Sequence, residues 1–429
     1  MHQLTRRFTA LFASVLAILP AYGLTASLVG LTLGSRGQDG WLGAAGAAYF
    51  VGLGTGSLRA ERVIAAVGYL RAYGMLTAVA CLGTLAIALV DHPAAWVVAR
   101  GIQGLALGGL FVCIESWLGS ATDAGSRGRV LGLYQVTIYV GLILGQALLA
   151  PLANDVPRAM VVAAMLLCVA ALPVGATRQA PPNLVVMPRF RLVELWSVAS
   201  VGVVGAFVSG LTTGAVYTVA PAAGGAAGLD DGQVAWLMAA FIGGGLVLQI
   251  PLGRASDTFD RRIILGIIGA LAALGGILSM AALSRPLLLI AVSAFEGGWV
   301  FATYAIALAY AYDRVAPERL VSANAALLAV FCAGSALGAT GSSVALSLAG
   351  PMGFYGALVV PSLALAVMAF RAARLWDPVP DADQSDVVLL PRTSSVLVEL
   401  DPRVDILVAT GVEVVDDTLL VAPGEDGEE

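Results

Sequence analysis

Three ionisable side chains interrupt long apolar runs of this 429-residue sequence, and they are its first candidates for chemistry. Arg100 and Glu115 fall in the run at 95–118, and Glu296 falls near the middle of the run at 286–312. A charged group at the centre of a bilayer costs at least about 2.5–3.5 kcal/mol on insertion scales. Because such residues usually bind cargo, move protons or pair with another charge, each is a functional candidate.

Polar and aromatic side chains share helix faces with two of these residues. At about 100° per residue, one face of the first run holds Arg100, Gln103, Leu107 and Phe111, and one face of the other holds Glu296, Trp299, Thr303, Ala307 and Tyr310. Other apolar runs contain Gln135, Tyr139 and Gln146, and then Thr213 and Tyr217. These mixed faces predict the lining of a cavity or pathway for a substrate or a proton. The alternative is that the polar groups bond to neighbouring helices and the aromatic groups only pack.

The sequence lacks the usual signatures of enzyme sites. Its four cysteines stand alone in separate apolar runs, and its two histidines lie near chain ends or loops. No pair has metal-ligand spacing, and neither a zinc-protease pattern nor a phosphate-binding GxxxxGK[ST] loop occurs. We therefore expect no catalytic residue, no metal site and no cofactor. A membrane-embedded enzyme is the weakest functional hypothesis.

The apolar runs predict an all-α integral membrane protein. Hydrophobic residues make up 59% of the chain and charged residues 12%, about half the charged share of a soluble domain. One bilayer crossing needs about 20 apolar residues, and a helix is the default in lipid. Twelve transmembrane helices are expected, at 8–34, 41–58, 68–90, 95–118, 130–152, 157–176, 196–220, 233–252, 263–284, 286–312, 322–348 and 353–372.

The arginines predict how these helices are oriented. If the N-terminus is cytoplasmic, the connections on that side hold seventeen arginines, and the outer connections hold only Arg36, Arg158 and Arg285. Positive residues concentrate on the cytoplasmic side of membrane proteins. Both termini are therefore expected in the cytoplasm, and a bacterial cytoplasmic membrane is the expected location.

A Pro-containing polar stretch divides the expected helices into two groups of six. The predicted units are an N-terminal six-helix bundle at 1–176, a cytoplasmic linker at 177–195, a C-terminal six-helix bundle at 196–376 and an acidic tail at 377–429. The tail holds 14 acidic residues and two arginines. Because the basic residues of the body lie in short separate connections, the sequence predicts no nucleic-acid partner.

Two motifs resemble signatures of the major facilitator superfamily. The connection after the eighth expected helix contains Gly253, Arg254, Asp257, Asp260, Arg261 and Arg262, which resembles G-x-x-x-D-x-x-G-R-R except that Asp260 replaces the usual glycine. The fourth helix contains Arg100-Gly101-Ile102-Gln103-Gly104, which is similar to R-x-x-Q-G. Further stretches, Glu115 to Leu118, Arg127 to Leu131, Gly141 to Gln146 and Ala307 to Arg314, resemble a poorly characterised bacterial branch.

The resemblance implies a fold and a mechanism. It implies two pseudo-symmetric six-helix bundles and a secondary transporter that carries small molecules by alternating access, coupled to protons and working as a monomer in the lipid bilayer. The first, fourth, seventh and tenth helices would line the central cavity. Gln146 stands where the antiporter signature of the fifth helix has proline, so antiport is not implied. The alternative is a transporter-like sensor that signals through the acidic tail.

The resembled motif also predicts a cytoplasmic gate. Asp257 follows the eighth helix, and its carboxylate could dock at the positive N-terminal end of the fifth helix, which begins after Arg127 and Arg129. Glu115 lies near the cytoplasmic end of the fourth helix and is a further candidate for this gate. The alternative is a solvated turn whose arginines only determine topology.

The orientation can be tested directly. Reporter domains fused after Pro182 and after Asp377 should score cytoplasmic, and one fused after Gly225 should score external, because of the arginine distribution. The reversed pattern would overturn the orientation and every gate assigned from it.

Overall fold

The computed structural model describes residues 2–120, 122, 127–176, 192–316 and 319–375. Most of the predicted linker and all of the predicted acidic tail from residue 377 lie outside these residues. Every regular element of the described part is a helix. The elements are α1 (His2–Ser35), α2 (Asp39–Val67), α3 (Tyr69–Leu89), α4 (Pro93–Ser120), α5 (Arg127–Ala147), α6 (Leu149–Leu152), α7 (Val156–Gly175), α8 (Leu192–Ala226), α9 (Asp231–Thr258), α10 (Arg261–Ala282), α11 (Pro286–Tyr312) and α12 (Leu320–Leu375).

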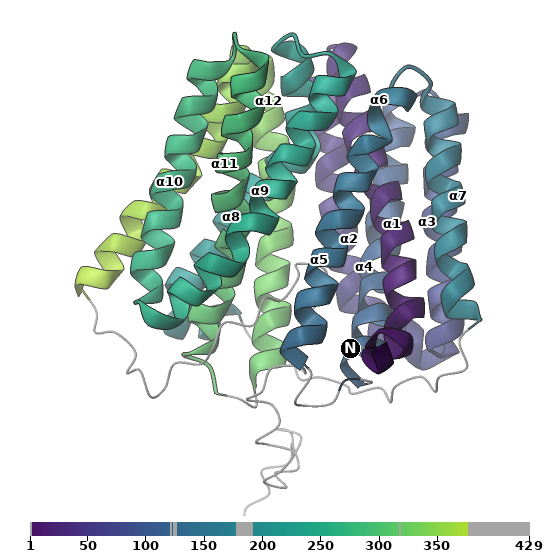
Figure 1. The fold of residues 1–429 in the computed structure, drawn as a ribbon, viewed down its shortest axis with the longest axis horizontal. Coiled ribbons are helices and arrows are strands. Elements are labelled where there is room, and N and C mark those ends of the chain that lie inside the picture. Colours follow the sequence, from purple (N-terminus) through teal and green to yellow (C-terminus); the bar gives the residue numbers. More distant parts are fainter. Residues whose placement is uncertain (1, 121, 123–126, 177–191, 317–318, 376–429) are drawn as a thin grey trace, which may run out of the picture.

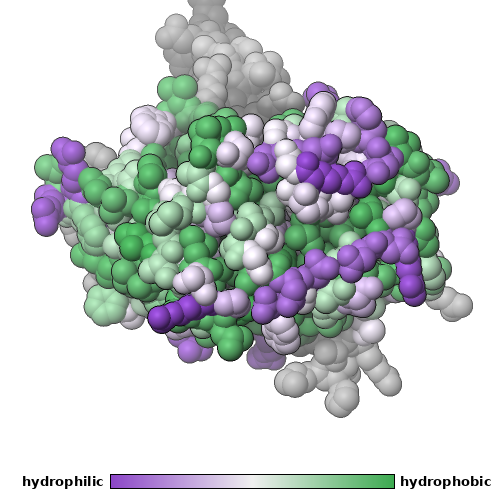
Figure 2. Space-filling model, turned by 90° about the horizontal axis from the view of Figure 1, so that it is seen from above, coloured by the Kyte–Doolittle hydropathy of each residue, from purple (hydrophilic) through white to green (hydrophobic). Residues whose placement is uncertain are grey.

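The helices run up and down beside one another in one bundle, some in front of others (Figure 1). Ten helices of the described part are long and apolar enough to cross a membrane. Large apolar side chains also point outward, as at Leu82, Leu172, Trp236 and Val247, which are 66–69% exposed. Seen from above, hydrophobic residues reach the rim on most sides and hydrophilic residues form narrow bands (Figure 2). This surface fits lipid and confirms the predicted all-α membrane fold.

One of these elements accounts for two of the predicted spans. A straight helix of the 56 residues of α12 would be about 84 Å long, nearly three times the thickness of a bilayer core. It breaks at Ala349 and at Gly350, whose φ of 59° is a left-handed value that suits glycine. This break lies between the predicted spans at 322–348 and 353–372. With α2 as a further crossing helix, the structure is consistent with twelve spans.

We call helices α1 to α7 the N-terminal half and helices α8 to α12 the C-terminal half. Within the N-terminal half α1 packs on α5 and α7, and α2 packs on α4; within the C-terminal half α8 packs on α12, and α9 packs on α11. The halves meet where α1 packs on α8, α2 on α12, and α5 on α9. We call the end of the bundle where α1 begins the N-terminal face, and the end where α1 finishes the opposite face.

Small residues bring the two halves close together near the opposite face. A Cβ added at Gly34 of α1 would lie 2.4 Å from the Cβ of Ala222 in α8. A Cβ added at Gly46 of α2 would lie 2.4 Å from the side chain of Thr218 in α8 and 2.8 Å from Ala339 in α12. Such distances leave no room for a side chain or a water molecule. The halves are therefore in close contact at these two positions.

The close contact makes a prediction for two glycines of one helix. Gly46→Ala should lower the thermal unfolding midpoint in detergent, because overpacking of this kind costs about 1–3 kcal/mol. Gly40→Ala is the matched control in α2, since an added Cβ there meets no atom within 4 Å. The control should unfold at the wild-type temperature or slightly above it, because alanine is the better helix former. Equal midpoints for the two variants would contradict the close contact.

Candidate functional site

A cavity of about 90 Å³ lies between the two halves. Its lining comes from α1, α2, α4 and α5 on one side and from α8 and α12 on the other: Leu19, Tyr22, Tyr49, Phe50, Leu53, Phe111, Gln135, Ile138, Tyr139, Leu142, Thr213, Tyr217 and Phe331. The volume has room for a few water molecules, or for a small compound of similar size. It is therefore a small pocket between the two halves and a candidate binding site.

Aromatic rings form much of the cavity wall. Tyr22 stacks on Tyr49 with ring centroids 5.0 Å apart, and it meets Tyr217 of the other half edge-on at 6.1 Å. The few polar groups include Gln135, whose Oε1 atom is buried and has no hydrogen-bond partner in the described structure. A cavity with apolar walls and one free acceptor is typical of a small-molecule site.

Arg100 lies behind the tyrosines of this wall. Its guanidinium carbon is 4.4 Å from the ring centre of Tyr49 and 5.8 Å from that of Tyr22, within the range of cation–π contacts. Arg100 donates to Gln103 Oε1 at 2.8 Å, and Gln103 Nε2 donates to Thr84 Oγ1 at 2.9 Å. On the predicted face of the fourth helix, Phe111 thus lines the cavity directly, and Arg100 contacts two tyrosines that line it. Gln103 holds Arg100 in place.

A hydrogen-bonded cluster joins the halves below the cavity, toward the N-terminal face. Gln249 of α9 accepts a hydrogen bond from Tyr139 at 2.8 Å and one from Gln135 Nε2 at 3.2 Å, both from α5. All three residues are buried, and Gln135 and Tyr139 also line the cavity. Gln249 was not among the residues predicted for the site. Its cluster therefore links two cavity-lining residues of α5 to α9 of the other half.

Other predicted residues of α4 and α5 bond within the N-terminal half. Gln146 accepts from Ser27 Oγ at 2.8 Å and donates to the carbonyl of Gly23 at 3.4 Å, so it joins α5 to α1. Glu115 accepts from the hydroxyl of Tyr134 at 2.9 Å, which joins α4 to α5. Neither residue is among those that line the cavity.

The predicted face of the tenth span does not form one surface of the cavity. Glu296 is fully buried and accepts from Ser279 of α10 at 2.9 Å. Trp299 packs against Phe295 with ring centroids 5.8 Å apart, and Thr303 donates to the carbonyl of Trp299 in its own helix. The structure therefore does not bring Glu296 to Arg100. The periodicity identified a shared helix face but not which neighbouring helix each residue meets.

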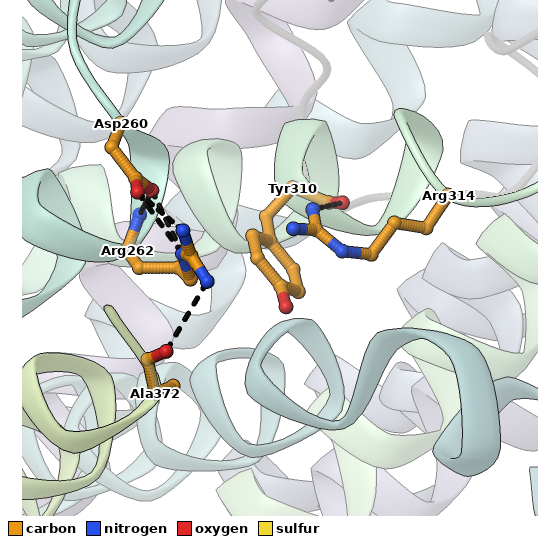
Figure 3. A network of polar contacts seen from close by, with 5 residues as sticks. All are labelled: Asp260, Arg262, Tyr310, Arg314 and Ala372. Carbon is orange, nitrogen blue, oxygen red and sulfur yellow. Dashed lines mark hydrogen bonds and ion pairs between the residues drawn. The ribbon is translucent and has the colours of Figure 1, made fainter. Parts of the chain in front are cut away.

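Tyr310 belongs to a network at the N-terminal face of the C-terminal half (Figure 3). The guanidinium of Arg314 lies 3.7 Å from the ring centre of Tyr310 and donates to its carbonyl at 3.2 Å. Nearby, Arg262 pairs with Asp260 at 2.6 Å and donates to the carbonyl of Ala372 at 3.2 Å. Arg261 pairs with Asp313 at 2.7 Å, and both are buried. These contacts tie the ends of α10, α11 and α12 together.

Asp260 explains how the motif works without its usual glycine. Its carboxylate caps α10 by accepting from the backbone N–H of Arg262 at 2.9 Å. Burial by itself would raise the pKa of Asp260, but the hydrogen bonds from Arg262 outweigh burial and lower it below its usual value. Asp260 thus stays ionised at neutral pH. Its contribution to stability is lost only as the pH falls through that lowered pKa.

The motif is more helical than the sequence predicted. The expected connection at 253–262 contracts to two residues, because α9 continues to Thr258 and α10 begins at Arg261. Gly253 is therefore buried inside α9, and Arg254 is exposed one residue later. Asp257 is half-buried in the last turn of α9. Arg129 is exposed, and the side chain of Arg127 lies outside the described part.

Sequence reasoning missed the tyrosines that face Arg100. Tyr22 and Tyr49 each interrupt an apolar run, and a phenol in a lipid-spanning helix needs a polar partner. That signal was available for both residues. The missed apolar lining, such as Leu53 and Phe331, carries no such signal, because an apolar residue can face the lipid, the core or a cavity equally well.

The comparisons with known proteins agree on the family. The sequence profile of the Major Facilitator Superfamily matches residues 202–407, and that of "Sugar (and other) transporter" matches residues 16–177. An uncharacterized MFS-type transporter of Enterobacter sp. (strain 638) is 28% identical over 352 residues, which cover 79% of this chain and 89% of the relative. The uncharacterized MFS-type transporter YcaD of Escherichia coli is 28% identical over 344 residues, which cover 79% and 88%.

Solved structures share the fold at lower identity. A mutant of the nucleoside transporter NupG has a TM-score of 0.66 at 12% identity, covering 86% of this chain and all of that one. A D-xylose-proton symporter has a TM-score of 0.65 at 13% identity, covering 90% of this chain and all of that one. The chain belongs to the major facilitator superfamily. It is therefore a membrane transporter and not an enzyme, as the sequence predicted.

The Gln249 cluster yields a prediction about opening of the cavity. Gln249→Leu removes the acceptor of two buried donors across the halves, each worth about 0.5–1.5 kcal/mol. In a background without native cysteines, a cysteine at the cavity residue Leu53 should then react about tenfold faster with a hydrophilic maleimide in detergent. Gln146→Leu is the matched control, because its hydrogen bonds stay within the N-terminal half.

Unchanged labelling of the Gln249→Leu protein would show that the cluster does not hold the halves together.

The same assay addresses Asp257, which stays a predicted latch between α9 and α5. Asp257→Asn should also speed labelling, since the docked carboxylate would lose its charge. Unchanged labelling would show that Asp257 is only part of the end of α9 and does not act as a latch.

Proposed function

We propose that this transporter moves small, largely apolar compounds across a bacterial cytoplasmic membrane by alternating access. One observation carries the proposal: the cavity is lined by both halves, and the halves pack closely on each other near the opposite face at Gly34 and Gly46. If the halves rock about this cavity, the site opens to one side at a time. Because one chain completes the cavity, a monomer is sufficient.

The arginines support an orientation for the two barriers. Described arginines gather near the N-terminal face, as at Arg59, Arg254 and Arg371, and this face would be cytoplasmic. Glycine packing would then close the external side, and the Gln249 cluster would close the cytoplasmic side. The cytoplasmic barrier would rest on hydrogen bonds that can break singly, whereas the external barrier would rest on close packing at Gly34 and Gly46.

The lining supports an apolar or aromatic cargo over a sugar. A sugar carries a hydroxyl on most carbons, and each buried hydroxyl needs a partner. The cavity instead offers leucine, isoleucine and phenylalanine side chains with a few tyrosines, Thr213 and Gln135. The free Oε1 atom of Gln135 can accept one hydrogen bond from a cargo. The similarity to a xylose symporter therefore extends to the fold and does not supply the substrate.

We also propose that Glu296 carries a coupling proton. Its Oε2 atom accepts from Ser279, and its Oε1 atom has no hydrogen-bond partner in the described structure. No arginine of the described residues forms an ion pair with it. A buried carboxyl group without a counter-charge favours its protonated form. Because Glu296 lies against α10, a change in its protonation would act on the packing of α10 and α11.

Glu296→Gln tests the coupling. Proteoliposomes are screened with a panel of small aromatic acids, alcohols and amines, with and without a pH gradient. For a compound that wild type moves, the variant should lose gradient-driven transport and keep exchange at equal pH, since glutamine keeps the shape but holds no exchangeable proton. Glu194→Gln, which changes an exposed carboxylate paired with Arg319, is the control and should behave as wild type.

Wild-type pH dependence in the Glu296→Gln protein would make Glu296 a structural residue. Failure of wild type to exchange any compound of the panel would count against the proposed transport of small apolar cargo. The sensor alternative would require the acidic tail, which lies outside the described residues. Deleting residues 377–429 should leave flux intact in a transporter.

A further inference from the structure

Arg100 is a buried cation whose described partners are all neutral. It is 5% exposed, and it contacts the amide of Gln103 and the rings of Tyr22 and Tyr49. None of the ion pairs of the described residues includes it. Burying a charge without a counter-charge is costly, and buried charges are therefore usually paired. The positive charge of Arg100 is thus left uncompensated by the described protein.

The uncompensated charge acts on the cavity. Two of the residues that Arg100 contacts, Tyr22 and Tyr49, form part of the cavity wall. None of the described lining residues is ionisable to an anion at neutral pH, since the acidic groups among them are phenols. An interior of low dielectric constant weakens electrostatic interactions far less than water does. The cavity is therefore electropositive on the side of α4.

The acidic residues of the same membrane region do not cancel this charge. Glu296 lies in the C-terminal half and bonds to Ser279 of α10. Glu115 lies four turns farther along α4, where it accepts from Tyr134. Both carboxyl groups thus have partners of their own, and neither lines the cavity.

We propose that the cargo is a small organic anion with an aromatic or apolar body. This inference rests on the proposed function, because it takes the cavity as the cargo site. The rings of Tyr22, Tyr49 and Tyr217 would pack on the body of the cargo, and the anionic head would lie on the side of Arg100. A hydroxyl or N–H group on the body could donate to Gln135 Oε1. The cargo then supplies the counter-charge that the protein lacks.

The test uses three probes of similar size and different charge. Purified full-length protein in lipid nanodiscs is titrated calorimetrically with benzenesulfonate, benzenesulfonamide and phenyltrimethylammonium, with empty nanodiscs as the blank. We expect benzenesulfonate to bind at least tenfold more tightly than the neutral sulfonamide, and the cation to bind weakest. Equal affinities, preference for the cation, or no binding of benzenesulfonate would overturn the proposal.

Variants assign the preference to Arg100. Arg100→Gln should remove at least tenfold of the affinity for benzenesulfonate and leave that for the sulfonamide nearly unchanged. Arg100→Lys, which keeps the charge, should retain part of the preference. Arg285→Gln removes the same charge from an exposed position at the opposite face and should change nothing. A folded Arg100→Gln protein with wild-type preference would contradict the assignment. If that variant does not fold, the preference for benzenesulfonate is compared between Arg100→Lys and wild type. A partial loss supports the assignment, and an unchanged preference contradicts it.

A transport measurement separates this inference from the proposed function. Benzenesulfonate is permanently charged and crosses lipid poorly, so its counterflow in proteoliposomes measures transport by the protein. Exchange of the sulfonamide or the cation without exchange of benzenesulfonate would leave the transporter intact and overturn the anionic cargo. Binding of benzenesulfonate that depends on Arg100, without any exchange, would retain the anion site and overturn alternating access.

Discussion

Close contact between helix backbones is the constraint on which the rest of this structure depends. In lipid, apolar side chains gain little by leaving their surroundings, so helices associate through packing and hydrogen bonds. Glycines provide that packing within each half: a Cβ at Gly104 would meet the carbonyl of Tyr49, and one at Gly297 would meet that of Phe241, at 2.0 and 2.2 Å. The same device at Gly34 and Gly46 joins the halves near the opposite face. The cavity is what remains where bulky aromatic residues replace these small ones.

Two different kinds of interaction join the halves on either side of the cavity, and the difference has consequences for the proposed motion. Glycine packing consists of many short-range contacts between atoms, and all of these contacts are lost at once when the helices separate. The cluster around Gln249 consists of hydrogen bonds between side chains, and water can replace each partner as the end opens. Gln135 and Tyr139 take part in both this cluster and the cavity lining. A cargo that bonds to either residue therefore competes with, or reinforces, the contact between the halves.

Charge is distributed so that the body of the transporter holds few uncompensated groups. At the N-terminal face, Arg261 and Arg262 each have a carboxylate partner, and Asp260 also caps a helix. These pairs tie together the end of the C-terminal half, which would move as one body in the proposed rocking motion. Arg100 and Glu296 differ, since each is buried with neutral partners. They lie in opposite halves and in different surroundings, so cargo binding and proton binding would be coupled through helix packing rather than through direct contact.

Much of the fold could be predicted from the sequence, because hydrophobicity over about 20 residues and arginine placement act locally along the chain. The break near Gly350 and the cost of placing Arg100 and Glu296 in lipid were visible in the same way. The cavity lining could be predicted only in part: Phe111, Gln135, Tyr139, Thr213 and Tyr217 were expected there, and the other lining residues were not. A helical face can be read from periodicity, but the neighbour that the face meets depends on how helices pack, which is why Gln135 and Tyr217 reach the cavity and Gln146 and Trp299 do not. Tyr49 carries a signal as a phenol in an apolar run, but only tertiary packing placed it beside Arg100 and placed Gln249 opposite Tyr139.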